Sequence, residues 1–182
     1  ESAANAIVSG IFAATGQSCV AGSRLLVHAS VHKQLMETLV AKAQRIKIGD
    51  PQNLETEMGP LATQRQLTHV QDIVDRSVST GAKLLTGGKI PTVFESGYYY
   101  EPTILDCTDS VVACVQEEIF GPILAVTKVK SFDEAMKVAN NTEYGLTGAV
   151  LSKNRMHLEQ ARREFHVGNL YLNRKCTGAI VG

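Results

Sequence analysis

Cys19 is the residue whose type and surroundings are best suited to covalent chemistry. It belongs to residues 16–24, Gly-Gln-Ser-Cys-Val-Ala-Gly-Ser-Arg, and lies between a predicted helix and a predicted strand. Small neighbours leave a thiol approachable, and a thiolate is a strong nucleophile near neutral pH. A free cysteine is, however, often a small buried packing residue. The spacing alone leaves both interpretations open.

The other reactive side chains form no recognisable site. Ser18 and Ser23 lack the Gly-x-Ser-x-Gly frame of a serine hydrolase. His28 and His32 are separated by a predicted helix start at Ser30, so they need not share a face. The five histidines have no Cys or Asp cluster at ligand spacing, and we therefore expect no metal site.

Helical and strand-like segments alternate along the chain. Helices are predicted over residues 2–15, 31–46, 64–79, 132–140 and 155–165, with Ser30, Thr63 and Ser131 as N-caps. Strands are predicted over residues 24–28, 83–86, 98–105, 123–129, 147–151 and 169–172. This alternation predicts an α/β fold with a mostly parallel sheet in one domain, residues 1–182.

The composition argues against several classes of partner. The 182 residues include 18 basic and 18 acidic side chains, so there is no basic excess for nucleic acid and no polybasic run for a membrane surface. The apolar runs are too short to span a bilayer. The four scattered cysteines form no Cys-x-x-Cys pair, which is typical of free thiols in a reducing, cytoplasmic compartment. We expect Cys107 and Cys114 to pack in or near the sheet.

Both ends of the chain are abrupt. Residues 3–14 have the periodicity of a helix interior, with only Ser2 available as a cap, and residues 179–182 are an apolar run without a closing element. We therefore expect the chain to be part of a longer protein.

Four blocks of the sequence resemble signature segments of the aldehyde dehydrogenase superfamily. They are residues 16–24, residues 116–122 (Gln-Glu-Glu-Ile-Phe-Gly-Pro), residues 140–146 (Asn-Asn-Thr-Glu-Tyr-Gly-Leu) and residues 167–173 (Val-Gly-Asn-Leu-Tyr-Leu-Asn). Their order and spacing are similar to those of the family. The resemblance implies the family's catalytic domain, with a twisted, mostly parallel sheet and helices on both faces.

The resemblance also implies a reaction for Cys19. In this family the thiolate attacks an aldehyde to form a thiohemiacetal, hydride leaves to a nicotinamide ring, and water releases the acid from the resulting thioester. The backbone N–H of Cys19 would be one donor to the tetrahedral oxyanion. The implied partners are a small aldehyde and NAD, with NADP left open. The full-length protein would be a homo-oligomer.

Three residues are candidates for binding that cofactor. Glu118 matches the family's ribose-binding glutamate, since a carboxylate offers only acceptors to two ribose hydroxyls. Phe120 would pack near the nicotinamide ring, and Gln66 stands where some members touch the cofactor. The alternatives are a solvated carboxylate for Glu118 and core burial for Phe120.

Two segments of the sequence bear on the substrate, and they favour different aldehydes. Residues 168–182 are similar to the tail of the 1-pyrroline-5-carboxylate dehydrogenases of this family, in which Thr177, Gly178 and Ala179 would receive the α-carboxylate of glutamate γ-semialdehyde. That subfamily usually has a lysine just before the nucleophile, and here the residue is Ser18. Another aldehyde therefore remains an alternative, as do a coenzyme A-dependent, thioester-forming enzyme and a non-enzymatic binding module.

Several parts that the family needs are missing from this sequence. No Gly-x-Gly occurs, so the chain has no dinucleotide fingerprint. The family's cofactor domain, its general-base glutamate and the amide that completes its oxyanion hole all lie upstream of the segment matched here. We expect the isolated chain to be inactive as a dehydrogenase.

Overall fold

The computed structural model describes residues 1–108 and 113–176. The helices are α1 (Ser2–Phe12), the short 3-10 turn η1 (Ala13–Gly16), α2 (Ala29–Ala43), α3 (Gln64–Ser79), α4 (Ala113–Gln116), α5 (Phe132–Asn140) and α6 (Arg155–Glu164). The strands are β1 (Arg24–His28), β2 (Lys83–Thr86), β3 (Thr103–Asp106), β4 (Ile123–Val129), β5 (Thr147–Val150) and β6 (Asn169–Leu172). In these two stretches, no helix has both the length and the apolar character needed to cross a bilayer.

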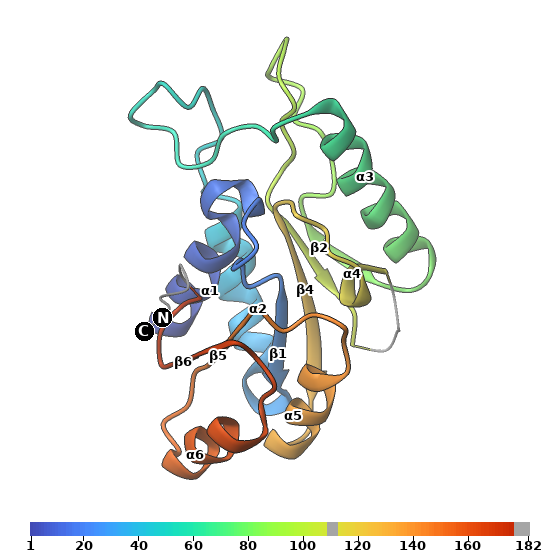
Figure 1. The fold of residues 1–182 in the computed structure, drawn as a ribbon. Helices are drawn as coiled ribbons and strands as arrows, with labels where there is room; N and C mark the ends of the chain where they lie inside the picture. The colour runs from blue at the N-terminus through green and yellow to red at the C-terminus, as the bar shows by residue number, and fades with distance from the viewer. Residues whose placement is uncertain (109–112, 177–182) are drawn as a thin grey trace.

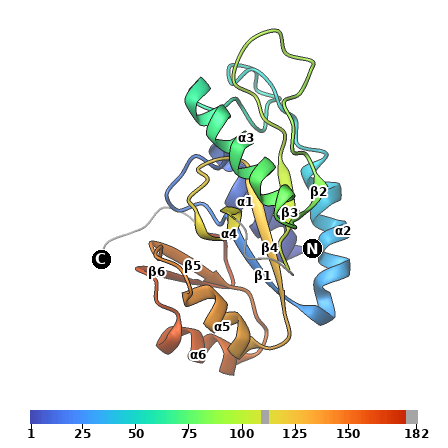
Figure 2. The same cartoon turned by 90° about the vertical axis from the view of Figure 1, so that its right-hand side faces the viewer.

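The strands of the described residues form two sheets. The larger has the order β1-β4-β3-β2, in which β1, β4 and β3 are parallel and β2 is antiparallel to β3. The smaller is the parallel pair β5 and β6, which lies below the large sheet with α5 and α6 (Figures 1 and 2). The predicted mostly parallel α/β fold is confirmed. Its division into two sheets is not something the alternation of elements predicts.

Both faces of the larger sheet are buried under helices, with α1 and α2 on one side and α3 and α4 on the other (Figure 1). Ile104 and Leu124 belong to the apolar cluster that includes α1 and α2. Leu105 and Ile123, their neighbours in sequence, belong to the cluster that includes α3. Successive residues of a strand point to opposite faces, so a strand buried on both faces needs a continuous apolar run. This explains the composition of β4.

Helix α2 begins earlier than predicted. Its first residue is Ala29, and the ring Nδ1 of His28 accepts a hydrogen bond from the backbone N–H of Ser30 at 3.2 Å. The prediction of Ser30 as the N-cap is therefore wrong, because the extended backbone at His28 lets its ring nitrogen take that role. The predicted caps Thr63 and Ser131 are confirmed, since each side chain accepts from an N–H of the first helical turn.

Strand β3 is shorter than the predicted strand over residues 98–105. Its ladder begins at Thr103, and the residues before it bond to loops instead: the Tyr98 carbonyl accepts from Leu61, and the Glu101 N–H donates to Lys89. The physical reason is the residue before the ladder, a proline, which has no N–H to donate to a neighbouring strand.

Candidate active site

The helix predicted over residues 2–15 ends three residues early, in a left-handed turn that leads to Cys19. Ala14, Thr15 and Gly16 have φ angles of 50°, 58° and 70°. A residue with a side chain costs about 1–2 kcal/mol in this conformation, so the first two of these are strained. Helical periodicity could not reveal the turn, because its residues are small and fit a helix equally well.

Two long-range hydrogen bonds stabilise this turn. The hydroxyl of Thr15 donates to the carbonyl of Gly59 at 3.0 Å. The side-chain carbonyl of Gln17 accepts from the backbone N–H of Ala62 at 2.8 Å. Both partners lie in the loop that precedes α3. The strained turn is therefore held against this loop, and the position of Cys19 depends on it.

The turn presents the Cys19 thiol and its backbone N–H. The side chain is exposed. The Ala21 N–H closes the turn by donating to the Ser18 carbonyl at 3.0 Å, and the Val20 N–H contacts the Ser18 hydroxyl at 3.5 Å. Within the part of the chain that the structure describes, the Cys19 N–H donates to no protein acceptor. An exposed thiol beside a free N–H can attack a carbonyl and receive the resulting oxyanion.

Glycine residues bring the two first signature blocks into backbone contact. A Cβ built on Gly16 would lie 2.0 Å from the carbonyl oxygen of Gly121, and one built on Gly121 would lie 2.5 Å from a methyl carbon of Val70 on α3. Neither position has room for a side chain. We call residues 14–21 the Cys19 turn. This turn, the segment around Gly121 and α3 therefore stack directly on one another.

The two neighbouring glutamates have different roles. Glu117 receives both terminal nitrogens of Arg76 at 2.9 Å, and hydrogen bonds from this guanidinium lower the pKa of Glu117. Glu118 is exposed, and its carboxylate has no hydrogen bond or ion pair among the described residues. Only its backbone carbonyl is held, 3.3 Å from the ring nitrogen of His69. One carboxylate is thus structural, and the other is free to bind a ligand.

Gln66 holds the backbone on which Phe120 is presented. Its side-chain amide donates to the carbonyls of Ile119 and Phe120, both at 2.8 Å. Phe120 has a φ of 53° and is 39% exposed, while Ile119 is buried. Core burial, the alternative interpretation of Phe120, is therefore contradicted by the structure. Gln66, His69 and Arg76 share one face of α3, and their helical spacing is the sequence signal that could have predicted this common role.

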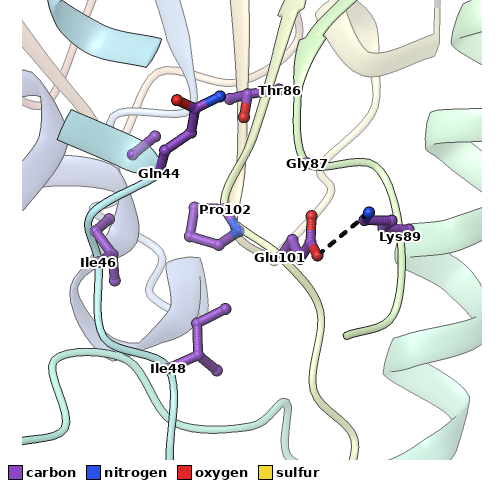
Figure 3. A pocket seen from close by; sticks show the side chains of 9 residues that line it. Gln44, Ile46, Ile48, Thr86, Gly87, Lys89, Glu101 and Pro102 are labelled. Carbon is purple, nitrogen blue, oxygen red and sulfur yellow. Dashed lines mark ion pairs between the residues drawn. The ribbon is translucent and has the colours of Figure 1, made fainter. Parts of the chain in front are cut away.

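A surface hollow of about 390 Å³ lies beside this backbone. Its lining residues come from the first turns of α3: Thr63, Arg65, Gln66 and His69. A second hollow, about 360 Å³, lies between the end of α2 and the start of β3, with the ion pair of Lys89 and Glu101 on its rim at 3.9 Å (Figure 3). Cys19 and Glu118 line neither of these hollows, and both side chains are exposed.

Arg24 connects the Cys19 segment to the second sheet. Its guanidinium nitrogens donate to the carbonyls of Val138 and Ala139, at 3.0 and 3.5 Å, in the last turn of α5. A cation is favourable at this end of a helix, where the dipole is negative. Burial lowers the pKa of Arg24. This role was missed in the sequence because α5 lies more than a hundred residues away.

The chain's last described residues approach the Cys19 turn. The hydroxyl of Thr147 contacts the carbonyl of Val20 at 3.4 Å. Burial raises the pKa of the Cys176 thiol, and the nearby Thr147 hydroxyl opposes this shift. Lys175 lies beside α1, with its Cβ 3.8 Å from where a Cβ of Gly10 would be. The predicted substrate-binding residues that come next lie outside the described residues: Thr177, Gly178 and Ala179.

The third and fourth signature blocks pack against each other around the second sheet. The side chain of Asn140 donates to the Glu164 carbonyl at 2.6 Å and accepts from the His166 N–H at 3.0 Å. The Gly168 N–H donates to the Gly145 carbonyl at 2.8 Å. These contacts join the ends of α5 and α6, so the two blocks have a structural role in this arrangement.

Comparison with known proteins gives a family and a set of relatives. The family model described as the aldehyde dehydrogenase family matches residues 1–182. Similar curated proteins include 1-pyrroline-5-carboxylate dehydrogenase 1 of Halalkalibacterium halodurans, 46% identical over 99% of this chain and 34% of that protein. Another is 1-pyrroline-5-carboxylate dehydrogenase of Bacillus licheniformis, 47% identical over 100% of this chain and 35% of that protein. The chain thus spans about a third of the curated relatives it matches.

Solved structures agree with this placement. A 1-pyrroline-5-carboxylate dehydrogenase from Thermus, with bound NAD, superposes with a TM-score of 0.92 at 41% identity. The match covers 100% of this chain and 34% of the Thermus chain. A 3,6-anhydro-L-galactose dehydrogenase superposes with a TM-score of 0.95 at 35% identity, over 100% of this chain and 38% of its own. The fold is therefore shared by dehydrogenases that are named for different substrates.

Proposed function

The chain belongs to the aldehyde dehydrogenase family, and we propose that it supplies the catalytic cysteine of an enzyme that oxidises an aldehyde to a carboxylic acid with NAD or NADP. The observation that carries this proposal is the Cys19 turn. An exposed thiol and a free backbone N–H lie in a strained loop that is packed, through Gly16, against the segment presenting Glu118.

In the proposed reaction, the Cys19 thiolate attacks the aldehyde carbon and forms a C–S bond. The backbone N–H of Cys19, which has no acceptor among the described residues, donates to the oxyanion that develops on the aldehyde oxygen. Bound NAD would accept the hydride that leaves this carbon, giving a thioester. Water then releases the acid and restores the thiol. The amide and the general base that complete this site are expected in other parts of the protein.

Two side chains of this chain suit a nicotinamide cofactor. The Glu118 carboxylate is exposed without a partner among the described residues, and offers acceptors to a pair of ribose hydroxyls. The Phe120 ring is exposed on a backbone that Gln66 holds in place, and offers an apolar surface to the nicotinamide ring. We propose Gln66 as a third contact through its side-chain carbonyl, since its amide nitrogen already donates to the backbone.

For the substrate we propose L-glutamate γ-semialdehyde, oxidised to L-glutamate in proline degradation. The relatives named for 1-pyrroline-5-carboxylate, at 46–47% identity, support this choice. The similarity of residues 168–182 to the tail of those dehydrogenases supports it too, and we propose Thr177, Gly178 and Ala179 as the residues that receive the α-carboxylate. The residue before the nucleophile, Ser18, and the similarity to a dehydrogenase of 3,6-anhydro-L-galactose favour the second candidate, another aldehyde.

The decisive experiment measures kcat/KM of the full-length protein for glutamate γ-semialdehyde and for propanal, with NAD and with NADP. We expect at least a tenfold preference for the semialdehyde, and equal values would favour the second candidate.

Replacing Cys19→Ala should lower turnover by about 10³-fold or more, as removal of a nucleophile does, whereas Ser23→Ala in the same segment should keep it. Analysis of the product, free acid or coenzyme A thioester, tests the remaining enzymatic alternative.

A binding module without activity is tested by thiol labelling. An aldehyde-mimicking thiol reagent should modify Cys19 before Cys176, and far before the buried Cys107 and Cys114. Absence of that preference would support the binding module.

For the full-length protein we further propose a cytoplasmic homo-oligomer. For this chain alone we propose no dehydrogenase turnover, because it spans about a third of its relatives.

A further inference from the structure

A second pair of thiols lies away from the Cys19 turn. The Sγ atoms of Cys107 and Cys114 are 3.2 Å apart, although seven residues separate them in sequence. Both residues are 1% exposed and belong to the apolar cluster between the sheet and α3. The proposed dehydrogenase reaction uses neither thiol, so their close approach has no role in it.

Each cysteine is anchored by its own backbone. The Cys107 N–H donates to the Val126 carbonyl of β4 at 2.7 Å. The Cys114 N–H donates to the hydroxyl of Ser77 on α3 at 3.1 Å. Two fixed backbones thus direct the two thiols at each other. The S–S bond of a disulfide is about 2.0 Å, so the sulfur atoms need to approach by only about 1.2 Å, a movement within reach of side-chain torsions.

We propose that Cys107 and Cys114 are a modification site at which hydrogen peroxide forms a reversible disulfide. The Cys114 thiolate attacks one peroxide oxygen and the O–O bond breaks. Hydroxide departs as the leaving group, and the Cys114 sulfur becomes a sulfenic acid. The Cys107 sulfur then attacks the sulfenic sulfur, forms the S–S bond and displaces a second hydroxide. The two thiol protons convert the two hydroxides to water. One peroxide is reduced to two waters, and two thiols are oxidised to one disulfide.

The environment distinguishes the two sulfurs. The hydrogen bond that the two thiols share lowers the pKa of Cys114, while that hydrogen bond and burial raise the pKa of Cys107. This favours Cys114 as the attacking sulfur and Cys107 as the resolving one. Helix α4 is only four residues long, so a local opening of this helix gives a small peroxide access without unfolding the sheet.

The disulfide would tie the end of β3 to α4. The residue three positions after Cys114 is Glu117, which Arg76 binds to α3. The crosslink therefore acts on the segment that leads directly to the exposed Glu118. The site is independent of which aldehyde the enzyme oxidises.

The sequence allows a direct test in the full-length protein. One tryptic peptide, residues 90–128, contains both cysteines, whereas Cys19 and Cys176 lie on other peptides. We expect native protein treated with a modest excess of hydrogen peroxide, and then with an alkylating reagent, to give this peptide without alkyl groups and lighter by two hydrogen atoms. Dithiothreitol should restore two alkylated cysteines.

The matched controls are Cys107→Ser and Cys114→Ser, which should each abolish the loss of two hydrogens while Cys19 is oxidised as before. A peptide that stays doubly alkylated in the native protein would overturn the proposal, as would one that gains oxygen atoms or closes only in denaturant. Oxidation of Cys114→Ser protein to a sulfenic acid at Cys107 would overturn the assignment of the attacking sulfur.

Discussion

Gly16 shows how one residue without a side chain determines the geometry of the Cys19 turn. The turn must contact the backbone of Gly121, and it must do so in the left-handed region, with a φ of 70° at Gly16. A Cβ is unfavourable on both counts, because it strains the backbone and overlaps a carbonyl oxygen. Gly22, six residues further on, has open space around its Cβ position and no positive φ.

We predict that Gly16→Ala destabilises the protein by about 2 kcal/mol or more and lowers dehydrogenase turnover, since the turn must move away from Gly121. Gly22→Ala is the matched control and should change stability by no more than about 0.5 kcal/mol. Chemical denaturation measures both. Equal midpoints for the two variants would show that the contact with Gly121 is not as close as described.

The neighbouring glutamates predict a difference in acid stability. The pKa of Glu117 is lowered by Arg76, so the contribution of this ion pair is complete above the unfolded pKa of about 4.3 and is lost as pH falls through the lower folded value. At pH 7, Glu117→Gln should melt about 1–3 °C below the wild type, because the pair is exposed and its effect is small. The gap should close as pH falls through that lower folded value. Glu118→Gln is the matched control and should melt with the wild type at pH 7, because the Glu118 carboxylate has no ion pair to lose among the described residues.

Helix α3 is the element that positions the cofactor-facing segment. One face of it contacts four successive backbone or side-chain groups, from Glu117 to Phe120, through Gln66, His69 and Arg76. The opposite face of the same segment meets the Cys19 turn at Gly121. A rigid helix can hold such a segment more precisely than a loop can, because its own hydrogen bonds are satisfied internally.

We predict that Gln66→Leu raises KM for NAD about tenfold, through loss of the two hydrogen bonds to the Ile119 and Phe120 carbonyls. Gln64→Leu, on the exposed side of the same turn, is the control and should leave KM unchanged. Hydrogen exchange separates two explanations. A positioning role requires faster exchange of the amides following Ile119 in the variant, whereas a contact with the cofactor alone would leave that exchange as it was.

At the scale of the whole molecule, two sheets are joined at the site. The larger sheet includes β1, which follows the Cys19 turn, and β5 and β6 form a separate parallel pair with α5 and α6 next to them (Figure 2). Arg24, at the start of β1, donates to the end of α5 beneath that pair. The apolar cluster of α5, α6 and the second sheet is separate from the two clusters of the larger sheet. A polar bridge is therefore an important part of this junction.

We predict that Arg24→Met destabilises the protein by about 2 kcal/mol, because two carbonyls lose a charged donor. Amide exchange in α5 should increase more than exchange in α3, which Arg24 does not contact. Arg45→Met, an exposed arginine near the end of α2, is the matched control. A uniform increase in exchange over the whole chain would contradict the assignment of Arg24 to this junction.

Local features of the chain could be predicted because short-range physics decides them. The caps at Thr63 and Ser131, the apolar run of β4 and the α/β alternation each depend on residues within a few positions of one another. The burial of Cys107 and Cys114 was predicted as well, and is confirmed. The resemblance of four short blocks pointed to the family that the whole chain matches.

The sequence by itself therefore determined the class of fold and the identity of the family, because these depend on local patterns and signature residues. The left-handed turn before Cys19, the division into two sheets, the meeting of the Cys107 and Cys114 thiols and the bridge from Arg24 were decided only by tertiary structure. Each joins residues whose spacing in sequence has no fixed relation to their distance in space. Long-range packing brings them together, and a periodic pattern contains no information about such contacts.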